Sequence, residues 1–121
     1  MAQQEQIKWL LNLREWELRN LPIRRSVMAY EIYLRLALLS GNGGPLHGVS
    51  LKRFYLSLGC SEYGARMHLR RLERDGWIGF VEGDGDRRGR QVVLTEKFEA
   101  LRRSHLQILS DLRQEPRPAR L

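Results

Sequence analysis

The chain has 121 residues, of which 42% are hydrophobic, and its 21 Lys and Arg against 14 Asp and Glu give a formal net charge of +7. This length suffices for one domain with its own core and is too short for two. The positive charge favours polyanionic partners, because cations that neutralise phosphates release condensed counterions.

Several other classes of protein are excluded by the same composition. No apolar run approaches the ~20 residues of a membrane-spanning helix, and the opening residues, MAQQEQIK, lack the features of a secretory signal. We therefore expect a cytoplasmic protein without a membrane segment. A single cysteine cannot form an internal disulfide, and three separated histidines give no metal-ligand spacing. The sequence predicts neither a metal nor another cofactor.

The first forty residues predict two helices. Residues 3–20 follow a helical period with two apolar faces, which suggests two packing partners. One face carries Ile7, Leu10, Leu11, Leu18 and Leu21, and the other carries Trp9, Leu13 and Trp16. Pro22 is expected to open a second helix that runs to Ser40, because proline is favoured just inside a helix start. Gly41 is expected to end it.

A short strand and a helical pair are predicted next. Residues 46–49, LHGV, favour a strand that pairs with a later hairpin. Two short helices follow at residues 50–58 and 61–74, with Gly59 in the tight turn between them.

The ends of these two helices carry their own signals. Ser50 and Ser61 are each placed to cap the helix that follows. Asp75 and Gly76 are placed to close the second helix.

The C-terminal third predicts a hairpin and a final helix. The β-type runs WIGFVE and RQVVLT flank a loop at residues 83–90, GDGDRRGR, which we expect to project as a wing. Thr95 is expected to cap a last helix whose apolar seam has a spacing of three and four residues. The seam consists of Phe98, Leu101, His105, Ile108 and Leu112. Residues 114–121, QEPRPARL, are expected to form a disordered tail.

Together these elements predict an α+β, mainly helical, winged helix-turn-helix. We expect residues 1–113 to form a single domain, with the helix-turn-helix at 50–75, the wing at 78–95, and flanking N- and C-terminal helices that dimerise. In such a fold an exposed helix of the right width enters the major groove of DNA.

One face of the helix at residues 61–74 is the candidate DNA surface. If Ala65, Leu69 and Leu72 face the core, the helical step of about 100° sends the arginine-bearing side outward. Arginine there can donate two hydrogen bonds to guanine, Tyr63 can bond a base or phosphate, and Met67 can contact a thymine methyl group. Gly64 would let the backbone approach closely. The candidate set is Ser61, Tyr63, Gly64, Arg66, Met67, Arg70, Arg71 and Arg74. The alternative is an ordinary solvated basic face.

The wing supplies the second candidate surface. Arg87, Arg88 and Arg90 repel one another unless an anion or a carboxylate accepts them. A minor groove or a phosphate backbone would do so. Asp84 and Asp86 count against a purely attractive wing, but either carboxylate can pair with one arginine and so orient another.

The series LRRLERDGWI followed by DGDRRGRQVVLTEK resembles the end of the recognition helix, the wing and the next helix of the MarR family of bacterial transcription regulators. The matching positions are Leu72, Glu73, Gly76, Asp86, Arg88, Leu94 and Thr95. The resemblance implies a homodimer held by the terminal helices, which binds a near-palindromic operator and usually represses. A dimer would set two recognition helices about 34–36 Å apart. The chain differs from the family in having one helix after the wing instead of two.

Other interpretations remain open at this point. A winged helix can be a protein-interaction module, or a phage or plasmid replication or partition factor. Trp9, Trp16, Tyr30 and Tyr33 could line a pocket for a small-molecule effector, although aromatics at helical spacing are usually core. Cys60 is interpreted as an inert thiol instead of a redox switch, and His68 and His105 are expected to be packed. We find no catalytic constellation, and the sequence therefore does not predict an enzyme.

Overall fold

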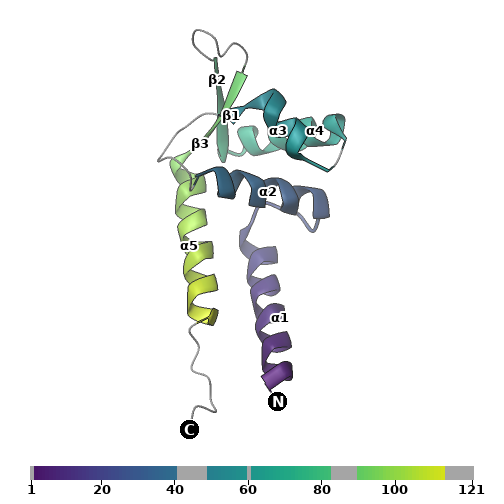
Figure 1. Cartoon of the computed structure of the whole chain (residues 1–121). Helices are drawn as coiled ribbons and strands as arrows, with labels where there is room; N and C mark the ends of the chain where they lie inside the picture. Colours follow the sequence, from purple (N-terminus) through teal and green to yellow (C-terminus); the bar gives the residue numbers. More distant parts are fainter. Residues whose placement is uncertain (1, 41–48, 60, 83–89, 114–121) are drawn as a thin grey trace.

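The computed structural model describes residues 2–40, 49–59, 61–82 and 90–113. In chain order the elements are α1 (Ala2–Asn20), α2 (Val27–Ser40), β1 (Val49–Ser50), α3 (Leu51–Ser57), α4 (Glu62–Arg74), β2 (Ile78–Glu82), β3 (Arg90–Leu94) and α5 (Glu96–Arg113). Figure 1 shows α1 and α5 as two neighbouring rods, with α2 lying across their upper ends and α3, α4 and the sheet beyond α2. The predicted mainly helical α+β class is confirmed.

The three strands form one antiparallel sheet in the order β1-β3-β2. Val49 pairs with Val92, which confirms that a strand before the helical pair joins the later hairpin. Residues 46–48 of that predicted strand lie outside the described residues. Because Ser50 pairs with Gln91 in the sheet, α3 begins one residue later than predicted.

The start of α2 differs from the sequence prediction. The helix begins at Val27 instead of Pro22, after a turn in which Arg24 and Arg25 adopt left-handed φ values of 43° and 58°. The turn places Ile23 fully in the core. The Ser26 hydroxyl then accepts a hydrogen bond from the Ala29 N–H at 3.1 Å, which makes Ser26 the helix cap. The local proline preference is overridden by burial and by this later cap.

The predicted limits of α4 are confirmed at both ends. The Ser61 hydroxyl accepts a hydrogen bond from the Gly64 N–H at 3.1 Å, which caps the first turn. Asp75 stands at the C-terminal end, followed by Gly76 with φ of 84°, a conformation that glycine adopts without strain. The chain then enters β2 at Ile78.

The core lies between α2, α4, the sheet and the beginning of α5. As predicted, Ala65, Leu69 and Leu72 are the buried residues of α4. Their buried partners include Ile32, Tyr33, Leu36, Phe54, Ile78, Val92, Leu94 and Phe98. Tyr33 stacks on Phe98, with 5.2 Å between the ring centroids.

A polar cluster is buried where α1, α2 and α5 meet. His105 is packed, as predicted: its Nε2 donates to Oε2 of Glu17 at 2.9 Å, and Trp16 stacks on its ring. The Tyr30 hydroxyl donates to the same Glu17 oxygen at 2.7 Å. These aromatic residues and Tyr33 therefore fill the junction of the three helices, which leaves the effector-pocket hypothesis for them without structural support.

Some expectations fall outside the described residues. Among them are the helix end at Gly41, Cys60 and the tail at 114–121. In the described part of the chain, no helix combines the length and the hydropathy needed to cross a bilayer.

Candidate nucleic-acid interface

The outward face of α4 has the composition that the sequence predicted. Tyr63 is 75% exposed, Met67 is 44% exposed, and the side chains of Arg66, Arg70 and Arg74 are also exposed. The helix buries its three apolar residues on the opposite side. The outward orientation is therefore confirmed, and contact with DNA remains a prediction.

The arginines of this face differ in their pairing. Arg66 forms an ion pair with Glu62, and its guanidinium lies 5.8 Å from the centre of the Tyr55 ring. Arg74 Nε lies 3.4 Å from Oδ1 of Asp75. Among the described residues, no carboxylate forms an ion pair with Arg70. Arg70 can therefore bind an external acceptor without first breaking an ion pair with any described residue.

Gly64 and Ser61 support α4 from within the protein. A Cβ atom on Gly64 would stand 2.9 Å from Cε and 3.1 Å from Sδ of Met28 on α2. The close approach expected at Gly64 is therefore one between α4 and α2. Ser61 is exposed, and its hydroxyl is engaged in capping the helix. Both residues therefore help to position α4.

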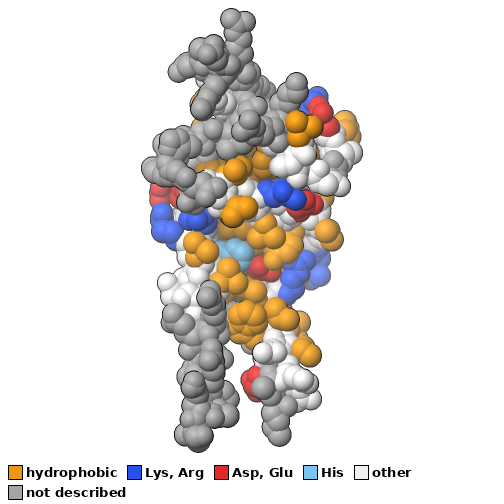
Figure 2. Space-filling view, in the orientation of Figure 1, with side chains coloured by type: hydrophobic (Ala, Val, Ile, Leu, Met, Phe, Trp, Pro, Cys, Tyr) orange, Lys and Arg blue, Asp and Glu red, His pale blue; other side chains and the backbone are white. Residues whose placement is uncertain are grey.

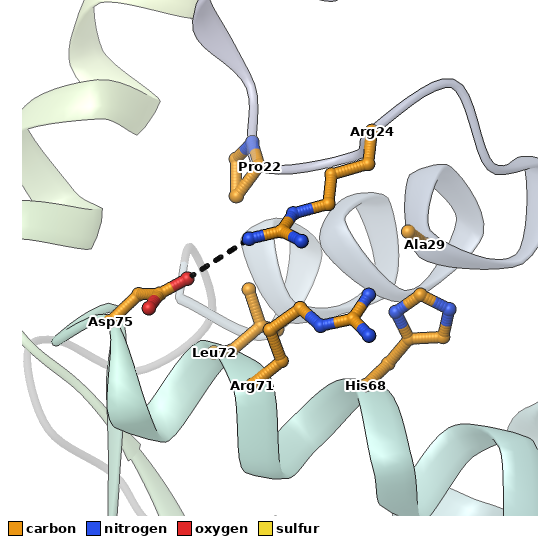
Figure 3. Close-up of a pocket in the computed structure, with 7 residues that line it drawn as sticks. All are labelled: Pro22, Arg24, Ala29, His68, Arg71, Leu72 and Asp75. Atoms are coloured by element: carbon orange, nitrogen blue, oxygen red, sulfur yellow. Dashed lines mark ion pairs between the residues drawn. The ribbon is translucent and has the colours of Figure 1, made fainter.

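Arg71 and His68 lie on a flank of α4 that turns toward α2. Both are half-buried, unlike the residues of the outward face. Together with Arg24 of the α1–α2 turn they line a small cleft, shown in Figure 3. The sequence placed Arg71 on a flank of the DNA surface, and the structure shows that this flank packs beside another element.

A set of contacts that sequence reasoning missed joins the end of α4 to the start of α5. The Thr95 hydroxyl lies 2.7 Å and 2.8 Å from the carbonyl oxygens of Gly76 and Trp77, and it accepts from the Phe98 N–H. Lys97 Nζ donates to the Asp75 carbonyl at 2.7 Å and lies 4.1 Å from the centre of the Trp77 ring. Thr95 caps α5, as predicted, and also fixes α4 against it. We call these contacts of Thr95 and Lys97 the α4–α5 clasp.

The wing is described only at its base. Ile78 pairs with Leu94 and Glu82 pairs with Arg90, which confirms the predicted hairpin. Arg90 begins β3, whereas Arg87 and Arg88 lie outside the described residues. Among the described residues, no group of three His, Cys, Asp or Glu side chains has a metal-binding arrangement.

Comparison with solved structures identifies the fold. No protein-family model and no curated protein matches the sequence. A protein from Bacillus cereus ATCC 10987, assigned as a MarR-like transcription regulator, is 22% identical, with a TM-score of 0.54 over 95% of this chain and 81% of that one. The transcriptional regulator PA3341 is also 22% identical, with a TM-score of 0.56 over 94% and 77% of the two chains. The chain therefore has the winged-helix fold of MarR-like transcription regulators.

Proposed function

We propose that this protein is a sequence-specific double-stranded DNA-binding regulator of transcription, with α4 as its recognition helix. The proposal rests on one observation above all: α4 buries its apolar side and exposes Tyr63, Met67 and Arg70 together. The net charge of +7 favours the same partner. The fold shared with two transcription regulators adds support.

Each exposed residue has a role suited to its chemistry. Arg70 donates two hydrogen bonds to a guanine edge in the major groove, and Met67 packs against a thymine methyl group. Tyr63 bonds a base or a phosphate. Arg66 and Arg74 each lie close to a carboxylate within the protein, so we assign them to positioning on the backbone.

The wing contributes the second contact in this proposal. The hairpin of β2 and β3 begins at Ile78, just after the end of α4 at Arg74. Arg87, Arg88 and Arg90 grip the phosphate backbone or the minor groove, without base selectivity.

We further propose that the protein acts as a homodimer and a repressor in the cytoplasm, with residues 1–113 as one structural unit. Ile7, Leu10 and Leu11 of α1 are 65%, 54% and 56% exposed, although all three are large and apolar. Figure 2 shows hydrophobic side chains gathered where α1 and α5 run together. A second copy that covers this surface would bury it and would hold two α4 helices for two half-sites. A dimer bound across a promoter would exclude the polymerase.

Selection of bound duplexes from random DNA tests the DNA-binding proposal. We expect a preferred sequence with two-fold symmetry. Arg70→Ala should relax the preference at particular base pairs. Arg88→Ala should weaken binding to all sequences and reduce the slope of log affinity against log salt by about one. Arg35→Ala is the matched control, because it removes the same charge from α2, where Arg35 pairs with Glu31. Equal effects of all three changes would refute this assignment of roles.

Sedimentation equilibrium tests the dimer. Leu10→Glu should dissociate it, because the carboxylate would have to be desolvated in the interface. Val27→Glu is the control, since Val27 is 80% exposed on α2, outside the α1 surface. A wild-type protein that stays monomeric at micromolar concentration would overturn the dimer proposal.

A further inference from the structure

A small cleft separates the α1–α2 turn from the flank of α4. It is lined by Pro22, Arg24, Ala29, His68, Arg71, Leu72 and Asp75. Its volume of about 20 Å³ is enough for one water-sized atom. Figure 3 shows the Arg24 guanidinium extending over the cleft from the turn, and Arg71 running along α4 beside the His68 ring.

The side chains around this cleft carry an excess of positive charge. Asp75 is the one carboxylate in the lining, and it already interacts with two arginines. Its Oδ2 lies 3.9 Å from Nη2 of Arg24, which is longer than a hydrogen bond, and its Oδ1 faces Arg74. Arg71 is half-buried and forms no ion pair within the described parts of the chain.

The surroundings of His68 favour its neutral form. Its pKa is lowered from the ordinary value of 6.5, first by burial and then by the charges of Arg71 and Arg24. The imidazole is therefore neutral at pH 7, and its ring N–H can donate a hydrogen bond. The wall of the cleft thus combines two guanidinium groups with a neutral donor.

The turn that carries Arg24 adopts a strained conformation. Arg24 and Arg25 both have left-handed φ values, although neither is glycine. Two consecutive non-glycine residues with left-handed φ values cost conformational free energy, and they persist only where the surrounding structure holds them. Here the buried Ile23 and the Ser26 cap hold the turn, and the result places the Arg24 guanidinium opposite Arg71.

We propose that this cleft is an oxyanion site for a phosphate group, with one phosphate oxygen in the cleft between Arg24 and Arg71. On binding, Arg24 exchanges its long contact with Asp75 for a hydrogen bond to phosphate, and His68 donates to a second oxygen. The remaining oxygens face solvent, so the same chemistry suits a free phosphate and a phosphodiester. Guanidinium groups match both, because their N–H donors pair with two oxygens at once.

Titration of the full chain with inorganic phosphate tests the site without DNA. The His68 imidazole resonances are followed by NMR at constant ionic strength, with chloride in a parallel titration. We expect a saturable shift with phosphate alone and a rise in the pKa of His68, because the bound anion offsets Arg71 and Arg24. Arg71→Met should weaken phosphate binding by about tenfold through the loss of a charged hydrogen-bond donor.

Two further variants complete this test. Arg24→Met removes a charge from an exposed turn and should weaken binding similarly, even if Arg71→Met fails to fold. Arg35→Met removes the same charge elsewhere on α2 and should leave phosphate binding unchanged. A wild-type shift that does not saturate, or equal phosphate affinity in Arg24→Met and Arg35→Met, would overturn the site.

DNA-binding measurements on the same variants identify the source of the phosphate. If the duplex backbone occupies the cleft, Arg24→Met should reduce the salt slope of DNA binding by about one, and DNA should displace inorganic phosphate. If a free anion occupies the cleft, Arg24→Met should leave the salt slope of DNA binding unchanged. Inorganic phosphate should then also bind to the protein–DNA complex. Should the protein fail to bind DNA at all, the proposed function fails while the phosphate titration still decides on the site.

Discussion

Oε2 of Glu17 lies 2.9 Å from Nε2 of His105, although the two residues are 88 positions apart in the sequence. Their side chains are only 3% and 7% exposed. Because Tyr30 donates to the same carboxylate oxygen, one buried group ties α1 to both α2 and α5. The orientation of the two long helices relative to the helix-turn-helix therefore depends on this carboxylate.

Removal of one partner from this pair should be costly. His105→Leu removes one of the donors to the buried Glu17 carboxylate, which keeps the Tyr30 hydroxyl, and we expect a loss of about 1–3 kcal/mol in the free energy of unfolding. The double variant Glu17→Leu/His105→Leu should lose less than the sum of the single changes, because each single change already breaks the hydrogen bond between these two residues. Urea unfolding at one fixed protein concentration measures all three. Strictly additive losses would contradict this coupling.

Two tyrosines should make the protein sensitive to alkali. Burial, the largest cause for both, raises the pKa of Tyr33 and that of Tyr30 to about 12 from 10.0, and Glu17 adds to both shifts. The folded state thus holds protons that the unfolded chain releases, so stability is complete below pH 10 and falls as the pH rises toward 12.

Unfolding experiments across this alkaline range check the tyrosine prediction. Tyr33→Phe should be less stable at neutral pH, because its hydroxyl, 3.5 Å from Nδ1 of His105, is lost. It should lose less further stability between pH 10 and 12 than the wild type. Phenolate absorbance, read in the same samples, reports which species titrates. A wild-type stability that stays flat over this interval would show that the shifts are absent.

The cap of α4 should matter for stability and for DNA binding together. Ser61→Ala removes the acceptor for the Gly64 N–H, and we expect a loss of about 1 kcal/mol. Ser61→Asp keeps an acceptor at this position and should retain most of the stability. Thermal unfolding and duplex binding are measured on both variants. Equal stability of Ser61→Ala and the wild type would argue against the cap.

Gly64 offers a test of the contact between α4 and α2. Gly64→Ala would gain helix propensity of about 1 kcal/mol, but its Cβ would displace the flexible end of Met28. We expect the two effects to offset each other in the wild-type background. In a Met28→Ala background the contact with Met28 is gone and the Ser61 hydroxyl at 3.2 Å remains, so the same change should be more favourable than in the wild type, by up to about 1 kcal/mol. A stabilisation of the same size in both backgrounds would contradict the contact.

Local signals in the sequence predicted α4 and its surroundings well. The spacing of Ala65, Leu69 and Leu72 specifies a helix and also identifies its buried face. A serine before this helix and a glycine after it mark its two ends. The same type of local reasoning misplaced the start of α2. There the decisive facts were the burial of Ile23 and the cap at Ser26, which compete with the preference of Pro22.

Long-range pairs were beyond prediction from periodicity. Helical spacing showed that His105 lies on the buried seam of α5, but it could not show that Glu17 would be its partner. Helical spacing placed Arg71 on a flank of the outward face of α4, but it could not show that Arg24 would lie opposite Arg71 across a cleft. Such pairings are set by how whole helices pack, and a single sequence does not record that packing directly.

The α4–α5 clasp has a mechanical consequence. Thr95 and Lys97 contact the carbonyl oxygens of Asp75, Gly76 and Trp77, which directly follow α4, so the C-terminal end of α4 is tied to the start of α5. A tilt of α5 would therefore move α4 with it. In the proposed dimer, the separation of the two α4 helices would then depend on the angle at which the α5 helices pack.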